Sequence, residues 1–214
     1  PMVRSIADID ALVAAMSQEE KIGQLTMLSA DMAISGPGLD PGWLAAVRAG
    51  RVGSLLNLWG AARVREAQRL AVEETRLGIP LLCCLDVIHG HRSIFPIPLG
   101  EAAAFDPELW ERTARAAAAE AAADGLALTF APMLDVCRDP RWGRIAEGPG
   151  EDAFLAQAFA VAKVRGFQGE DPAAPDRLAA CAKHLGAYGA VAGGRDYAPV
   201  DISERQLHEV YLPP

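Results

Sequence analysis

The sequence predicts an α/β fold with a parallel β-sheet, and three observations support this prediction. The chain has 214 residues, of which 51% are hydrophobic and 22% charged, so it can bury a substantial core. Short apolar runs recur along it, each nearly continuous in apolar residues, as in strands buried on both faces. Helical patterns separate these runs, and this alternation is typical of βα units in a right-handed parallel sheet.

Four apolar runs are the expected strands. They lie at residues 52–59, 79–87, 126–136 and 178–185. The helices expected around them carry end signals of their own. A helix should begin at Ser17, which has Glu20 at capping-box spacing. Residues 62–78 place apolar side chains at helical spacing and end on Gly78, a candidate C-cap.

The clearest helical pattern follows Asp106, a good N-cap residue, with Pro107 at the first helical position. Alanine and glutamate dominate this helix, and Gly125 closes it. Residues 153–169 form another amphipathic candidate. Strands and helices therefore alternate along most of the chain.

Polar residues follow the expected strands at their C-terminal ends. They are Asn57, Asp86, Asp135, Arg138, Lys183 and His184. In parallel α/β folds ligands bind at this end of the strands, because the βα loops leave the sheet there. We therefore expect these side chains to converge on one ligand-binding patch.

Lys183 and His184 are the most informative of these residues. The chain has three lysines and seventeen arginines, so solubility is a poor explanation for a lysine at the end of an apolar strand. An ammonium group offers three donors and a neighbouring histidine can donate or accept, which suits the hydroxyl groups of a sugar. The alternative is structural, with Lys183 reaching solvent past apolar neighbours and His184 satisfied in the core.

A charged loop, CRDPRWGRIAEGPGED at residues 137–152, follows the third expected strand. Its glycines and prolines disfavour a regular helix or strand, and a solvated connection is the simplest interpretation. Surface ion pairs contribute only about 0–1 kcal/mol each, however, so stability is a weak reason to concentrate so much charge there. A second charged loop at residues 193–201 carries Arg195 and Asp196 near the expected ligand site.

Asp86 is followed closely by His89, His91 and Arg92. Two histidines and an aspartate can bind a metal, but Gly90 and Arg92 disfavour a regular ligand set and no third strong ligand is evident. A carboxylate that accepts hydrogen bonds from two hydroxyl groups is the simpler interpretation of Asp86. We therefore expect neither a metal nor a cofactor.

Composition and motif content argue against several classes of function. The formal net charge is −8 with no run of lysine and arginine, so nucleic acid is not an expected partner. No apolar stretch reaches the roughly 18–20 residues of a membrane helix, so no membrane partner is expected. The sequence lacks a GxSxG elbow and a phosphate-binding glycine loop, which argues against serine hydrolases and nucleotide enzymes. The four cysteines show no metal-ligand spacing.

Five segments together resemble a known family. They are MSQEEKIGQL, RLGIPLLCCLDVIHGHRSIFPIPLGEAAAFDPELW, FAPMLDVCRDPRWGRIAEGPGED, ACAKHLGAYGAVAGGRDY and VDISERQLHEVYLPP. Their order and spacing are similar to those of the N-terminal domain of glycoside hydrolase family 3, in particular its bacterial β-glucosidase branch. The resemblance implies a (β/α)8 TIM-like barrel and a retaining, exo-acting β-glucosidase that hydrolyses terminal non-reducing β-D-glucosyl residues. Its substrates would be β-glucosides or short β-linked gluco-oligosaccharides.

The resemblance also assigns substrate-binding residues by their motif positions. They are Asp86, Arg92, Arg144, Lys183, His184 and Arg195. Asp86 should accept hydrogen bonds at the far side of the glucosyl ring, and the basic residues should donate to the other hydroxyls. The bond between Lys183 and His184 should be cis, as in similar members of the family. The loop that delivers Arg144 should be braced by its other charged residues, Arg138, Asp139, Arg141 and Glu147.

The chain departs from the family pattern in its catalytic carboxylates. Retaining glycosidases use two carboxyl groups about 5–5.5 Å apart. The β-glucosidase branch takes its nucleophile from an SDW-like motif downstream of YLPP and its acid/base from a later domain, and residues 1–214 contain no SDW. The chain is therefore expected to be the first part of the N-terminal barrel domain, without the rest of the barrel or the C-terminal α/β domain, and inactive in isolation.

Other functions stay open on the sequence. A β-xylosidase is one, whereas a β-N-acetylhexosaminidase is disfavoured because KHLGAYGAVAGG replaces the histidine-containing pattern KHFPGHG. A glucose-binding module or an inactive fragment is the alternative from a different class. Homo-oligomerisation is also open, and the compartment is the cytoplasm or the periplasm, with the cytoplasm favoured.

Overall fold

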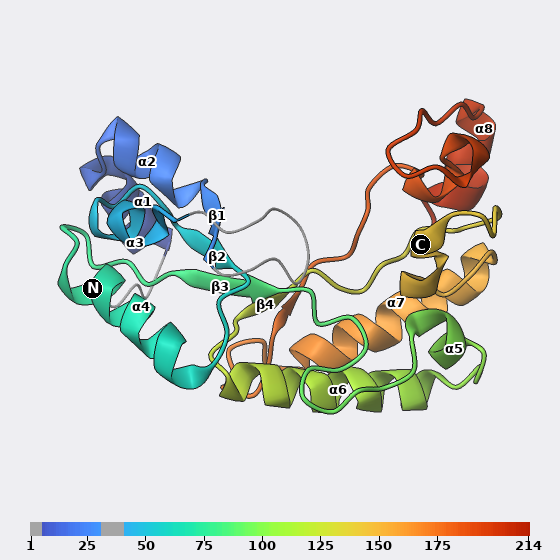
Figure 1. Ribbon diagram of the computed structural model, residues 1–214, viewed down its shortest axis with the longest axis horizontal. Coiled ribbons are helices and arrows are strands. Elements are labelled where there is room, and N and C mark those ends of the chain that lie inside the picture. Colours follow the sequence, from blue (N-terminus) through green and yellow to red (C-terminus); the bar gives the residue numbers. More distant parts are fainter. Residues whose placement is uncertain (1–5, 31–40) are drawn as a thin grey trace. The chain divides into compact units, whose positions relative to one another are not determined.

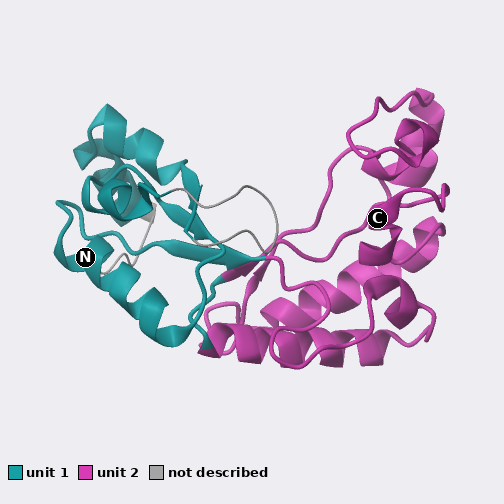
Figure 2. Ribbon diagram, in the orientation of Figure 1, with its two compact units in different colours: residues 1–85, 124–127 teal, residues 86–123, 128–214 magenta. Residues whose placement is uncertain are grey.

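The computed structural model describes residues 6–30 and 41–214 (Figure 1). The chain divides into two compact units (Figure 2). Unit 1 comprises residues 1–85 and 124–127, and unit 2 comprises residues 86–123 and 128–214.

Unit 1 has parallel strands with helices around them. The strands are β1 (Met27–Ser29), β2 (Ser54–Leu56) and β3 (Leu82–Leu85). The helices are α1 (Ile6–Ala15), α2 (Gln18–Gln24), α3 (Trp43–Arg48) and α4 (Ala61–Glu73). Strands β2 and β3 lie within the expected apolar runs, but the sequence does not predict β1, because Gln24, Thr26 and Ser29 interrupt the apolar residues around it.

The core of unit 1 lies between the strands and one face of α4. Leu55 of β2 pairs with Cys83 of β3, and both side chains are fully buried. Helix α4 turns its apolar stripe towards the interior, with its buried residues at helical spacing. These residues are Val64, Ala67, Leu70 and Ala71.

The helix-end signals of unit 1 are partly confirmed. Ser17 and Glu20 form the expected capping box at the start of α2, each side chain accepting from the other residue's backbone N–H. Helix α4 ends at Glu73, well before Gly78, so the C-cap prediction for Gly78 is wrong. The Thr75 hydroxyl instead accepts a hydrogen bond from the Gly78 N–H at 3.2 Å, which shapes the turn after the helix.

Unit 2 contains the remaining elements. Strands β4 (Leu128–Thr129) and β5 (Ala179–Ala180) pair in parallel. The helices are α5 (Pro98–Ala102), α6 (Pro107–Ala123), α7 (Ala153–Gln168) and α8 (Glu204–Gln206), with short 3-10 or π turns η1 (Gly143–Glu147), η2 (Tyr188–Ala190), η3 (Ala192–Gly194) and η4 (Leu207–Tyr211). Each of the four expected strand regions thus contains a strand, and the described pairings of these strands within a unit, β1 with β2, β2 with β3 and β4 with β5, are parallel.

Helices α6 and α7 pack against each other along their length (Figure 1). The Asp106 carboxylate accepts hydrogen bonds from backbone N–H groups of the first turn of α6, which confirms the predicted N-cap. A β-carbon on Gly166 would lie 2.4 Å from the Glu111 carbonyl oxygen, so this crossing requires a glycine. The rings of Trp110 and Phe159 meet in the interface with their centroids 5.2 Å apart.

A buried ion pair joins α5 to α7, and the sequence gives no sign of it. Lys163 Nζ lies 2.6 Å from Glu101 Oε2, with only 3% and 2% of the two side chains exposed. The ammonium group also donates to the Thr113 hydroxyl at 3.2 Å. Burial lowers the pKa of Lys163, while the Glu101 carboxylate opposes that shift. A buried charge is tolerated only when it is paired in this way.

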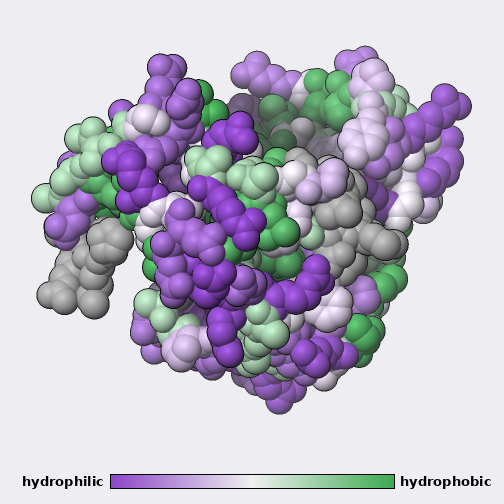
Figure 3. Space-filling model, turned by 60° about the vertical axis from the view of Figure 1, so that its left-hand side comes forward, coloured by the Kyte–Doolittle hydropathy of each residue, from purple (hydrophilic) through white to green (hydrophobic). Residues whose placement is uncertain are grey.

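The described surface is mixed in character. On the face shown in Figure 3, hydrophilic side chains are interspersed with hydrophobic ones. The exposed large hydrophobic residues include Phe105, Phe154, Leu185 and Tyr197. Among the described helices, none has both the length and the apolar character that crossing a bilayer requires.

We expect Lys163→Met to destabilise the chain by about 3–5 kcal/mol, because it leaves the Glu101 carboxylate buried without its counter-ion. Lys21, which is exposed on α2, provides the matched control. Urea denaturation followed by tryptophan fluorescence measures both variants. Equal midpoints for Lys163→Met and Lys21→Met would show that the buried pair does not support the fold.

Candidate functional site

The candidate site is centred on the Lys183 ammonium group, just beyond β5. Backbone hydrogen bonds on both sides hold this residue, since its N–H donates to the Pro132 carbonyl and its carbonyl accepts from the Leu134 N–H. Its Nζ lies 2.6 Å from Oδ1 of Asp86, the first residue after β3. The structure therefore brings together two residues that the sequence placed at the ends of different strands.

The peptide bond between Lys183 and His184 is cis. The residue on its C-terminal side is histidine and not proline, and the family resemblance predicted a cis bond at this position. The prediction is confirmed.

Arg144 reaches the same cluster from η1, in the middle of the charged loop. Its guanidinium donates to Glu147 through Nε at 2.7 Å and Nη2 at 2.9 Å, a two-point pairing that fixes the plane of the group. These hydrogen bonds raise the pKa of Arg144 above its usual value. Glu147 also lies 3.8 Å from the Lys183 ammonium. A continuous row of opposite charges therefore runs from Asp86 through Lys183 and Glu147 to Arg144.

His184 is held by a buried carboxylate. Its ring Nδ1 lies 2.7 Å from Asp135 Oδ2, and its backbone N–H donates to the same oxygen at 3.1 Å. Only 1% of the Asp135 side chain is exposed. Because a carboxylate can only accept, Nδ1 carries a proton, and Nε2 is then the nitrogen that faces away from Asp135.

A glycine is required at position 189, since a β-carbon there would lie 2.3 Å from the Val136 carbonyl oxygen.

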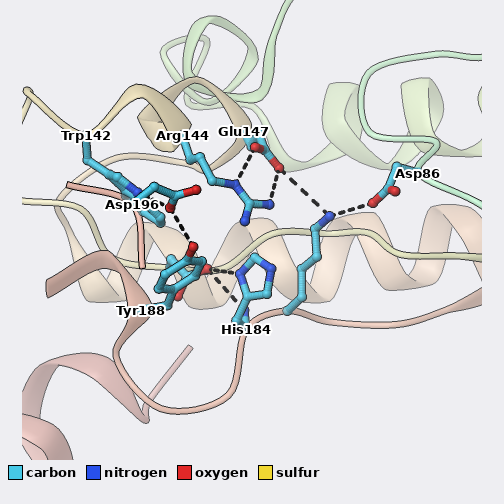
Figure 4. Close-up of polar contacts among 9 residues, drawn as sticks. Asp86, Trp142, Arg144, Glu147, His184, Tyr188 and Asp196 are labelled. Atoms are coloured by element: carbon cyan, nitrogen blue, oxygen red, sulfur yellow. Dashed lines mark hydrogen bonds and ion pairs between the residues drawn. The ribbon is translucent and has the colours of Figure 1, made fainter. Parts of the chain in front are cut away.

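Three further residues complete the site, and the sequence did not assign them a role. The Asp196 carboxylate accepts hydrogen bonds from Trp142 Nε1 at 2.9 Å and from the Tyr188 hydroxyl at 2.5 Å (Figure 4). The Tyr188 ring meets His184 edge to face, with centroids 5.0 Å apart, and lies under the Arg144 guanidinium at 5.5 Å. The two loops are rich in aromatic and acidic residues, and this is the only feature of the sequence that points to these three. The sequence does not show which of these residues contact one another.

The charged loop is anchored by its tryptophan. Trp142 is fully buried in a cluster with Met133, Cys137 and Val191. Asp139 and Arg141 brace the loop as expected, since the Arg141 guanidinium donates to both carboxylate oxygens. The bracing role predicted for Arg138 is wrong, because its exposed side chain makes no hydrogen bond or ion pair within the part of the chain that is described.

The two remaining predicted residues lie on exposed loops. Arg92 follows β3 in a tight loop, and the Glu120 carboxylate on α6 accepts from the backbone N–H groups of Arg92 and Ser93 at 2.9 and 2.8 Å. The Ser93 hydroxyl donates to the other oxygen at 2.6 Å, and these hydrogen bonds lower the pKa of Glu120. Arg195 is exposed beside Asp196. Sugar binding by Arg92 and Arg195 stays a prediction.

No metal site accompanies these groups among the described residues, where three or more histidine, cysteine or acidic side chains nowhere gather in a suitable arrangement. His89, a candidate ligand, lies with its Nδ1 3.1 Å from the Phe95 carbonyl oxygen instead. A pocket of about 160 Å³ adjoins Lys183 and His184 on the side of Asp135 and Leu185. The arrangement offers charged donors and carboxylate acceptors side by side, which suits a neutral polyhydroxylated ligand.

Residues 17–214 match the family model described as glycosyl hydrolase family 3 N terminal domain. The chain belongs to this family. It is 40% identical over 209 residues to a periplasmic β-glucosidase of Salmonella typhimurium, covering 97% of this chain and 27% of the relative. It is 31% identical to a putative β-xylosidase of Formosa agariphila, covering 96% and 30% of the two chains.

Solved structures agree with the family assignment. The β-glucosidase of Listeria innocua in complex with glucose is 38% identical, with a TM-score of 0.89, over 98% of this chain and 31% of that protein. The predicted α/β fold class and the family resemblance are therefore confirmed. The chain spans less than a third of the length of each of these relatives.

We expect Glu120→Ala to increase trypsin cleavage between Arg92 and Ser93 about fivefold, because three hydrogen bonds that hold this loop are lost. Glu120→Gln should stay closer to the wild type, since its amide oxygen can still accept from the backbone. Mass spectrometry of the peptides, scaled to cleavage at the other arginines, measures the effect. Unchanged cleavage in Glu120→Ala would mean that the carboxylate does not hold the loop.

Proposed function

We propose that this chain contributes the glucosyl-binding subsite of a retaining, exo-acting β-glucosidase. The observation that carries the proposal is the row of alternating charges formed by Asp86, Lys183, Glu147 and Arg144. His184, fixed by Asp135, lies next to this row. The family membership of residues 17–214 supports the same function.

The chemistry of the row suits pyranose hydroxyl groups. Each hydroxyl can donate one hydrogen bond and accept others, so a ring with several hydroxyls needs donors and acceptors that alternate. The Lys183 ammonium has more hydrogens than its bond to Asp86 uses, and the Asp86 carboxylate can accept more than one. Hydrogen bonds to charged groups are stronger than those between neutral groups. A sugar that lacks a hydroxyl would leave partly buried charges unpaired, which gives selectivity.

The carboxylates of the site act in binding and support under this proposal. Asp86 and Glu147 pair with basic side chains of this chain, and Asp135 is committed to His184. A retaining mechanism needs a nucleophile and an acid/base with carboxyl groups about 5–5.5 Å apart and both facing the sugar. We assign these two roles to residues outside positions 1–214.

The proposed substrates are β-glucosides or short β-linked gluco-oligosaccharides. Structures of the Listeria innocua β-glucosidase exist in complex with glucose, and of its D270A mutant with laminaribiose, and these ligands belong to that protein. A β-xylosidase is the second candidate, because the chain is 31% identical to a relative from Formosa agariphila with that putative name. Xylose lacks the hydroxymethyl group of glucose, so the relative affinity for the two sugars separates the candidates.

Glucose should bind the wild-type chain, and Lys183→Ala should weaken binding roughly tenfold or more, because hydrogen bonds to a charged group contribute about 1.5–3 kcal/mol. Isothermal titration calorimetry measures both affinities, with Lys21→Ala as the control for loss of a lysine. A chain that binds no glucose, or a Lys183→Ala variant that binds as well as the wild type, would contradict the proposed subsite.

The isolated 214-residue chain should not hydrolyse an aryl β-glucoside, because both catalytic carboxyl groups are assigned elsewhere. Release of the aryl group, followed by absorbance at high protein concentration, measures this. Turnover above that of the Lys183→Ala variant would place a nucleophile and an acid/base within these residues.

A further inference from the structure

Two of the predicted sugar-binding side chains, His184 and Arg144, pack against the ring of Tyr188. Its ring meets His184 edge to face, with an interplanar angle of 87°, and the Arg144 guanidinium lies over the same ring. His184 and Arg144 come from different loops, so the orientation of one ring affects both. Whatever fixes Tyr188 therefore also fixes the relative position of these two donors.

We propose that Asp196 is a positioning residue that orients Tyr188, and through it His184 and Arg144, for sugar binding. The inference rests on the proposed function, because the orientation matters only if these groups bind a sugar. It adds a role for three residues that touch no expected catalytic atom, namely Trp142, Tyr188 and Asp196.

The first step is that the position of Asp196 is itself fixed. Trp142 is fully buried, and its ring nitrogen donates to Asp196 Oδ1 at 2.9 Å. An indole N–H can only donate, so the carboxylate is its natural partner. Gly194 allows this approach, because a β-carbon there would lie 2.7 Å from the Trp142 backbone nitrogen. The loop that carries Asp196 is thus attached to a buried side chain of the core.

The second step is that Asp196 fixes Tyr188. The Tyr188 hydroxyl donates to the same oxygen at 2.5 Å, and its ring packs edge to face against Trp142, with centroids 5.1 Å apart. A tyrosine ring held by its hydroxyl and by an aromatic neighbour has little freedom to rotate. His184 and Arg144 therefore pack against a fixed surface.

The electrostatics agree with this arrangement. Burial and the Asp196 carboxylate raise the pKa of Tyr188, so its hydroxyl stays a donor at neutral pH. Hydrogen bonds from Tyr188 and Trp142, together with the charges of Arg144 and His184, lower the pKa of Asp196. The carboxylate is thus ionised at neutral pH, and its contribution is lost only as the pH falls through this lowered pKa.

The competing explanation is that Asp196 only closes its own loop. Variants that keep or remove the hydrogen-bond acceptor at position 196 separate the two explanations. In Asp196→Asn the amide oxygen can accept from both Trp142 and Tyr188, whereas Asp196→Ala removes the acceptor. Tyr188→Phe keeps the ring and removes only the hydroxyl that Asp196 holds.

Calorimetric titration with glucose tests the proposal in the 214-residue chain. Asp196→Ala and Tyr188→Phe should each weaken binding roughly fivefold, and the double variant should lose no more than Asp196→Ala alone, because that change already removes the acceptor of the Tyr188 hydroxyl. Asp196→Asn should recover most of the affinity. Glu170→Ala, which removes an exposed acid outside the site, is the control and should bind like the wild type. Ultraviolet titration of the tyrosines should show one of them ionising at lower pH in Asp196→Ala.

Two results would overturn the inference while leaving the proposed function intact. One is wild-type affinity in Tyr188→Phe, which keeps the test decisive even if Asp196→Ala fails to fold. The other is an Asp196→Asn variant that binds as weakly as Asp196→Ala, since charge and not hydrogen bonding would then be required. Absence of glucose binding by the wild type would overturn the proposed function, and the positioning role with it.

Discussion

The candidate site depends on how the Lys183 ammonium is held. Only 13% of this side chain and 14% of Asp86 are exposed, so neither charge is fully hydrated and each needs the other. Backbone hydrogen bonds to Pro132 and Leu134 fix the position of the Lys183 main chain. The 2.6 Å contact between its Nζ and Asp86 fixes the orientation of the side chain. Glu147 then lies between two cations, which connects the charged loop to the end of β5.

The part of this arrangement that follows from strand order could be predicted from the sequence. Buried strands show as apolar runs, and parallel strands present their C-terminal ends on the same side. The residues expected to meet were therefore Asn57, Asp86, Asp135, Arg138, Lys183 and His184. The pairings of Asp86 with Lys183 and of Asp135 with His184 confirm part of this prediction, whereas the exposed Arg138 pairs with none of them among the described residues. Arg144 lies in a loop without regular periodicity, and only the family resemblance indicated that it belongs with them.

The rest of the site depends on contacts that no local pattern encodes. Trp142 and Asp196 are 54 positions apart and meet because two loops fold onto each other. Arg138 and Asp139 look alike as charged loop residues, yet Asp139 is committed to Arg141 and Arg138 extends into solvent. The same limit applies to Gly78, because a C-cap signal predicts a helix end only if the helix continues that far.

A comparison of two lysines shows how burial decides whether an ion pair stabilises the fold or can also bind a ligand. Lys163 and Lys183 both lie 2.6 Å from a carboxylate oxygen. Lys163 is almost completely enclosed by α5, α6 and α7, and it donates a second hydrogen bond to the Thr113 hydroxyl. Lys183 has a similar ion pair but stays partly open, next to His184 and within 4 Å of a second carboxylate. A cation that is paired yet accessible can exchange hydrogen bonds with a ligand at little reorganisation cost, whereas an enclosed one can only hold the fold. Access therefore decides which of the two otherwise similar ion pairs can take part in function.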